Sequence, residues 1–167
     1  EAGEERGKQR GTSYHNTVTI DGQDSSEVWE SFRVARRASL TGLYVDQHES
    51  NIDVMAKHNG YYWLKGSPAH ERHWIFSSNN LSIEDRVKGR FKFAVSRFHI
   101  HPECIVHFWD RKGVIEGPGL KIELEIEVGK IQIEGSSWHP YFGLPLSMKC
   151  LAVSLIEGRS RVTLSFN

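Results

Sequence analysis

The sequence predicts an all-β protein, an antiparallel β-sandwich of the supersandwich-like kind with little or no helix. Apolar and polar residues alternate repeatedly along the chain, the period expected of strands with one buried face. Turn-forming pairs separate these segments at intervals of roughly 8–12 residues, a spacing typical of sandwiches. At 167 residues, 38% of them hydrophobic and 25% charged, the chain can build one domain around a core.

The strand and turn pattern covers almost the whole sequence after the first ten residues. Alternation is clearest at 17–20, 91–95, 104–108 and 120–128, and weaker at 39–46, 51–57, 73–77, 81–88, 130–134, 151–157 and 161–166. Turn signals occur at Asp21-Gly22, Asn59-Gly60, Lys112-Gly113, Gly117-Pro118-Gly119 and Glu157-Gly158, and they favour antiparallel hairpins. We expect a helical turn around Ser26–Phe32 and nowhere else.

The charged opening segment is expected to be a disordered linker remnant over residues 1–10, because it has almost nothing to bury. The sandwich domain is then expected over residues 11–167. Cys104 and Cys150 each lie in an apolar stretch, and two such distant thiols favour buried free cysteines over a disulfide.

Charge and hydropathy exclude some classes of partner. Lys plus Arg and Asp plus Glu both number 21, so no basic excess indicates a nucleic-acid partner, although a local basic cluster could still hold an acidic glycan. No apolar run approaches the ~20 residues of a membrane span, so none is expected. The sequence does not predict the cellular compartment.

His15 stands just before a predicted strand, and a polar, turn-rich loop follows. Taken alone, this residue can be a metal ligand, an acid/base group or an ordinary histidine at the start of a strand. The run from His15 to Ala38, HNTVTIDGQDSSEVWESFRVARRA, resembles the HNT-V-x-V-DGQDQS-x-x-W-x-x-F-R segment of the heparinase II/III-like family, with Ser25 where the family often has Gln.

Three later stretches resemble that family in the same order. His58–Tyr61 is similar to its His-Asp-Gly-Tyr, Arg97–Pro102 to its Arg-x-x-His-x-x-Pro region, and Trp138–Gly143 to its Trp-x-x-Pro-x-Phe-Gly. The first motif is specific and the later ones are weak alone. The resemblance identifies 11–167 as the C-terminal β-sandwich domain of such a protein, which joins an α/α toroid to the sandwich and cleaves uronic-acid polysaccharides by β-elimination.

The resemblance implies that most of the chemistry lies elsewhere. The family's Asn, Tyr and His that remove the C5 proton, neutralise the uronate and protonate the leaving oxygen precede the His-Asn-Thr motif, so no catalytic residue is expected in this chain and the chain alone should be inactive. It also implies that His15 is one ligand of a structural zinc site in the full-length parent. Since such a site needs about four ligands, it is incomplete here. A periplasmic or cell-envelope parent would fit.

Other clusters have competing interpretations. His99 and His101 lie two apart on a predicted strand, a spacing that metal sites use, but solvent-facing or hydrogen-bonded strand histidines are the favoured interpretation. His70 and His73 lack the i, i+4 spacing of a zinc protease. Trp29 with Arg33 and Arg36 could bind an acidic polysaccharide through an aromatic face and guanidinium groups, or could be ordinary surface residues.

Three functions therefore remain open. The chain can be the non-catalytic part of a lyase, packed against its missing toroid; a module that binds acidic carbohydrate; or a structural domain of a non-cleaving capsule or cell-envelope protein. If leading strands are absent, an exposed edge should surround His15 and invite self-association.

Overall fold

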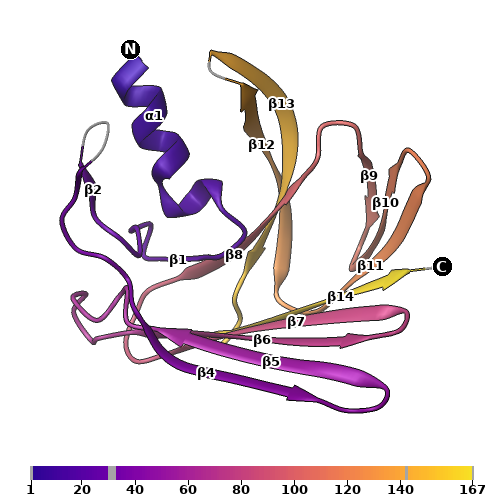
Figure 1. Ribbon diagram of the computed structural model, residues 1–167, viewed down its shortest axis with the longest axis horizontal. Helices are drawn as coiled ribbons and strands as arrows, with labels where there is room; N and C mark the ends of the chain where they lie inside the picture. The colour runs from indigo at the N-terminus through magenta and orange to yellow at the C-terminus, as the bar shows by residue number, and fades with distance from the viewer. Residues whose placement is uncertain (1, 30–32, 142, 167) are drawn as a thin grey trace.

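The protein is an antiparallel β-sandwich, as the alternation predicts (Figure 1). The computed structural model describes residues 2–29, 33–141 and 143–166. Within these ranges the strands form an 8-stranded, a 4-stranded and a 2-stranded sheet. None of the helices in the described part of the chain is long and apolar enough to span a membrane.

The large sheet combines two meanders that the C-terminal strand joins. In spatial order its strands are β4 (Leu40–Gln47), β5 (Asn51–His58), β6 (Ala69–Ser77), β7 (Asn80–Lys88), β14 (Arg159–Phe166), β11 (Leu120–Val128), β10 (Lys112–Gly117) and β9 (Ile105–Trp109). Because β14 pairs with β7 on one side and β11 on the other, the sheet is continuous only with the last strand in place.

The small sheet covers one half of the large one. Its order is β1 (Val18–Ile20), β8 (Ala94–Ile100), β13 (Leu144–Ser154) and β12 (Lys130–Tyr141). The main core cluster between the sheets consists of Ile115, Leu124, Ile126, Leu151, Val153 and Val162. A second cluster consists of Val18, Ile20, Tyr61, Val87 and Ala94. Burial of these side chains is the main force that holds the two sheets together.

The other half of the large sheet presents an uncovered apolar face. Directly paired residues point to the same side of a sheet, so the register places Leu43, Val45, Ile52 and Phe76 on the side that carries Arg72 and the core. Their exposed fractions are 64%, 60%, 38% and 46%. Among the described residues nothing buries this face, which we call the bare face.

Two short elements differ from the sequence prediction. Residues 1–10 were expected to be disordered, but Ala2–Arg10 form helix α1; Glu, Gln, Lys and Arg are good helix formers, and Lys8 and Arg10 lie in the last turn, where the helix dipole favours cations. A 3₁₀ turn, η1 (Thr12–Tyr14), follows. The bounds 11–167 for the domain stay a prediction.

The helical turn expected at Ser26–Phe32 is wrong where it can be compared. Val28–Trp29 form strand β2, which pairs with β3 (Arg33–Val34), and residues 30–32 lie outside the described residues. The turn expected at Lys112-Gly113 is also misplaced, since β10 begins there and the left-handed turn residue is Asp110, with φ of 55°. Gly113 is small for packing: a Cβ there would lie 2.6 Å from the Phe108 ring.

The cysteines are free, as expected, with Cys150 buried and Cys104 only half-buried. Burial raises the pKa of the Cys150 thiol to about 11. Both facts indicate that Cys150 is a core residue and not a nucleophile.

Tyr61 fastens the loop after β5 to the edge of the small sheet. Its side chain is 0% exposed, its hydroxyl donates to the Val18 carbonyl at 2.5 Å, and burial raises the phenol pKa well above its usual range. A buried carbonyl that loses its donor costs more than an exposed one.

Tyr61→Phe should lower the free energy of unfolding by about 1–2 kcal/mol, because the buried Val18 carbonyl is left without a partner. Tyr62→Phe, at a neighbouring residue that is 42% exposed, is the matched control and should change little. Urea unfolding measures both. Equal effects of the two substitutions would contradict this role for Tyr61.

Candidate functional site

A hollow of about 350 Å³ opens beside the turn η1. It is lined by Tyr14, His15, Asn16, His99, His101, Trp138 and Met148. They come from the segment before β1, from β8 and the residue directly after it, and from β12 and β13. The fold thus brings His15 together with the His99–His101 pair, which the sequence does not connect. We call this surface the histidine hollow.

The three histidines differ in environment. His15 is exposed, and its ring forms no hydrogen bond with a described residue. His101 is exposed and lies against Trp138, with ring centroids 4.7 Å apart. His99 is half-buried and its Nε2 donates to the Ser13 carbonyl at 3.1 Å, so its Nδ1 carries no proton in the neutral ring. Burial lowers the pKa of His99, which favours that neutral form.

These residues do not make a metal site by themselves. The described part of the chain contains no group of three or more His, Cys, Asp or Glu side chains arranged to hold a metal ion. Structural zinc sites use about four protein ligands. The arrangement therefore does not fit a complete zinc centre, although the exposed His15 ring is available as one ligand. The hydrogen-bonded interpretation of the strand histidines is confirmed for His99.

Asn16 connects the hollow to both sheets. Its side-chain Oδ1 accepts a hydrogen bond from the His99 amide at 2.8 Å, on β8 of the small sheet. Its carbonyl accepts one from Arg72 Nη1 at 2.6 Å, on β6 of the large sheet. The residue after His15 is thus held from two sides.

Behind Asn16 lies a buried ion pair that sequence reasoning missed. Arg72 donates to both carboxylate oxygens of Asp85, at 2.6 and 2.9 Å. Ser96 Oγ and His70 Nε2 also donate to this carboxylate, at 2.6 and 2.7 Å. Although burial alone raises the pKa of Asp85, the hydrogen bond from His70 and the charge of Arg72 hold it well below its usual range.

A chain of hydrogen bonds through two histidines extends from this ion pair toward the loop after β5. The Gly60 amide can only donate, so His58 Nδ1 accepts at 3.1 Å and the His58 proton is on Nε2. That Nε2 donates to His70 Nδ1 at 3.0 Å, and His70 then donates to Asp85. Both rings are therefore neutral, and burial first, then His70 and Arg72, lower the pKa of His58 to about 4.

The loop after β1 uses its polar side chains to bind backbone. Asp24 Oδ1 accepts from the Thr12 amide at 2.6 Å, and Asp21 Oδ1 accepts from the amides of Lys92 and Phe93 at 2.7 and 3.0 Å. Gly60 packs so closely on this loop that a Cβ would lie 2.8 Å from Ser25. Asp24 thus holds the start of η1, and Asp21 holds this loop against the segment before β8.

The sequence matches the family described as heparinase II/III-like, C-terminal, over residues 1–164. The chain belongs to this family. Two solved structures are similar: the heparinase III product of the BT4657 gene, with a TM-score of 0.75, and the same protein with methylated lysines, with a TM-score of 0.73. Each is 16% identical over 98% of this chain. No curated protein matches.

The chain spans about a quarter of the length of these heparinase III structures, since it covers 25% of each. At 16% identity the likeness establishes the fold alone. The family motifs nevertheless converge in space. Three of them contribute residues that line the histidine hollow: the His-Asn-Thr motif, Arg97–Pro102 and the stretch that begins at Trp138. The fourth, His58–Tyr61, supplies His58, which binds His70, and Tyr61, which binds the Val18 carbonyl.

The residues expected to bind substrate in this heparinase II/III-like domain lie near one another around a carboxylate. Trp29 and Arg33 are directly opposed in the β2–β3 pair. Glu27 accepts from Trp29 Nε1 at 2.8 Å and pairs with Arg36 at 3.2 Å, whose guanidinium lies 4.0 Å from the centroid of the Trp63 ring. The negative charge of Glu27 thus offsets the positive charge of Arg36. Of the two arginines, Arg33 is the exposed one.

Arg72→Met should destabilise the protein by about 3–5 kcal/mol, because it leaves the Asp85 carboxylate buried without its ion-pair partner. Chemical unfolding of Arg72→Met, Asp85→Asn and the double variant forms a cycle in which the double loss should be smaller than the sum. Arg37→Met, at an exposed residue, is the control. Strict additivity of the two single losses would contradict the pairing.

Stability should fall as the pH drops from about 6.5 toward 4. The pKa of His58 is lowered to about 4 in the folded state, so the unfolded chain binds more protons in this window and protonation favours unfolding. With partial solvent exposure the loss should be roughly 2 kcal/mol. Urea unfolding at several pH values should show a flatter profile for His58→Gln and an unchanged one for the exposed His48→Gln.

Proposed function

We propose that this chain is the C-terminal part of a polysaccharide lyase that cleaves uronic-acid polymers, of the heparin, heparan sulfate or alginate kind, by β-elimination. The observation that supports this most is the convergence of three family motifs on the histidine hollow. A surface that carries exposed imidazoles and an aromatic ring beside a rigid polar network suits one wall of a polysaccharide cleft.

In this proposal the chain is a supporting part and not the catalytic one. Proton abstraction from C5 and protonation of the leaving oxygen belong to groups upstream of the His-Asn-Thr motif. His15 contributes one ligand to a structural zinc site, and the upstream part supplies the others. Zinc there would tie the two parts of the protein together. The role of Asn16, Arg72 and Asp85 is to hold His15 at the correct place.

The partner of the sandwich is the α/α toroid and linker of the same polypeptide. The bare face supports this, since contiguous exposed apolar surface of this kind marks an interaction site. The chain also spans only a quarter of the similar heparinase III structures. Without that partner, the bare face and the edge strand β4 would favour self-association of the isolated chain.

Contacts with the acidic polysaccharide would come from Trp29, Arg33 and Arg36. An indole face packs on a sugar ring while a guanidinium pairs with carboxylate or sulfate groups. Because Glu27 already binds Arg36 and Trp29, we assign the stronger ionic contact to Arg33.

The isolated chain should show no lyase activity on heparin, heparan sulfate, alginate or hyaluronan, while the full-length parent should be active on one of them and contain zinc. Absorbance of the unsaturated product measures turnover, and metal analysis measures zinc. His15→Ala in the parent should lose both. The matched control is His48→Ala, at an exposed histidine in the turn between β4 and β5.

Turnover by the isolated chain would contradict the supporting role. A parent that binds zinc and uronate polymers without cleaving them would instead favour the carbohydrate-binding function, and one that does neither would favour a purely structural domain.

A further inference from the structure

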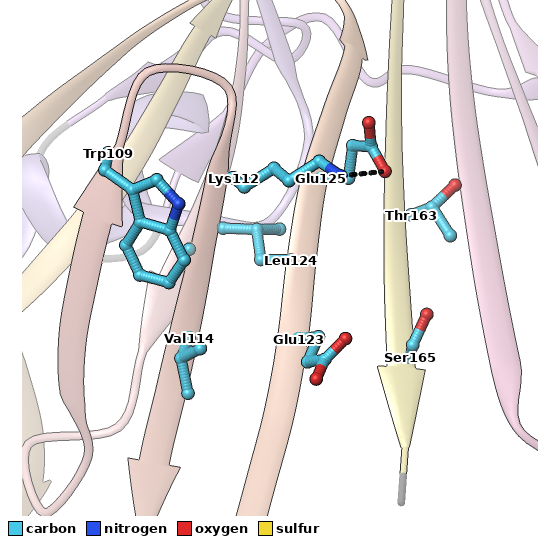
Figure 2. Close-up of a pocket in the computed structure, with 9 residues that line it drawn as sticks. Trp109, Lys112, Val114, Glu123, Leu124, Glu125, Thr163 and Ser165 are labelled. Carbon is cyan, nitrogen blue, oxygen red and sulfur yellow. Dashed lines mark ion pairs between the residues drawn. The ribbon is translucent and has the colours of Figure 1, made fainter.

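A second hollow lies on the opposite side of the large sheet from the histidine hollow. It has a volume of about 220 Å³ and crosses strands β9, β10, β11 and β14 (Figure 2). Side chains on a strand alternate between faces, and Leu124 and Ile126 point into the core. Glu123 and Glu125 therefore point outward, away from the small sheet. We call this surface the outer hollow.

Its apolar wall is an aromatic platform at a sheet edge. Trp109 is 55% exposed and ends β9, the edge strand of the large sheet. Figure 2 shows Trp109 and Val114 on the same side of the outer hollow, across from Thr163 and Ser165. An accessible indole presents a flat face with negative electrostatic potential, which packs on the C–H face of a sugar ring and attracts cations.

The floor of the outer hollow carries one uncompensated negative charge. Lys112 pairs with Glu125, with Nζ and Oε2 3.8 Å apart, whereas the exposed Glu123 has no ion pair with a described residue. On the far wall, the Thr163 hydroxyl donates to Glu127 at 2.5 Å and the Ser165 hydroxyl donates to Asn80 at 2.7 Å. Both hydroxyl oxygens therefore remain able to accept hydrogen bonds.

We infer that the outer hollow binds a hexosamine unit with a free amino group. The ammonium would pair with Glu123, the apolar face of the ring would pack on Trp109, and sugar hydroxyls would donate to Thr163 and Ser165. The single positive charge of such a unit matches the single unpaired carboxylate. A uronate or sulfated unit would instead meet the unpaired carboxylate of Glu123 with charge of the same sign. The site is thus separate from the proposed lyase cleft and has the opposite charge preference.

The test is binding of two uncleaved probes to the 167-residue chain, measured by calorimetry. A tetramer of β-1,4-linked glucosamine should bind, and its fully N-acetylated counterpart should bind at least several-fold more weakly. Trp109→Ala should weaken glucosamine-tetramer binding about tenfold. Glu123→Gln should weaken it several-fold while it leaves binding of the N-acetylated tetramer unchanged. Circular dichroism confirms that each variant is folded.

Phe93→Ala, at a 51% exposed aromatic residue that lines neither hollow, is the matched control and should bind the glucosamine tetramer as the unsubstituted chain does. Failure of this tetramer to bind, equal binding of the two tetramers, or equal losses in Trp109→Ala and Phe93→Ala would each overturn the inference. Because neither probe contains a uronate and no cleavage is measured, these outcomes are independent of whether the parent is a lyase.

Discussion

The buried ion pair between Arg72 and Asp85 is the interaction on which the placement of the histidine hollow depends. Both residues belong to the large sheet, but the donors and acceptors that complete the pair, Ser96 and the Asn16 carbonyl, come from β8 and from the segment before β1. Apolar packing alone would tolerate a small slide of one sheet over the other. A buried charge does not, because each lost hydrogen bond leaves an unsatisfied group in a poorly solvated place. The polar network therefore selects one arrangement of the sheets, and His15 and His99 take their positions from it.

The same sheet is well packed at one end and open at the other. Around β14 and β11 the core side chains are buried, whereas β4 and β5 expose leucine, valine and isoleucine on the same face of the sheet. This contrast places the Arg72–Asp85 pair at the boundary between finished core and uncovered surface. In the proposed lyase, residues at that boundary serve both the fold of this domain and its contact with the toroid, which agrees with the gathering of the family motifs there.

Much of the fold could be predicted from the alternation of apolar and polar residues. The small sheet and the core half of the large sheet each have one solvent-exposed and one buried face. The prediction was less successful where local sequence carries two meanings. Gly113 looks like part of a turn but is a strand residue that makes room for Phe108, and the charged segment Ala2–Arg10 forms a helix from residues that also suit disorder.

Only some residues of the histidine hollow and of the network behind it could be predicted from the sequence. His15 was identified through its motif, but His70, Arg72 and Asp85 read as polar strand residues, since alternation alone does not tell which face of β6 is buried. His70 and Arg72 alternate on β6, and such polar residues on a strand that also carries apolar ones can indicate a buried polar network. Their partner Asp85 lies on another strand, so the sequence alone does not connect them.

The position of β14 has a consequence for biosynthesis. Although β14 follows all other strands of the large sheet in the sequence, it lies in the middle of that sheet, between β7 and β11. Until β14 leaves the ribosome, β7 and β11 each present an unpaired edge, and the two meanders remain separate hairpin assemblies. Long-range pairings of this kind form slowly. Strand β14 must therefore be synthesised before this domain can close, and a nascent chain halted before β14 would hold two half-sheets with nothing to join them.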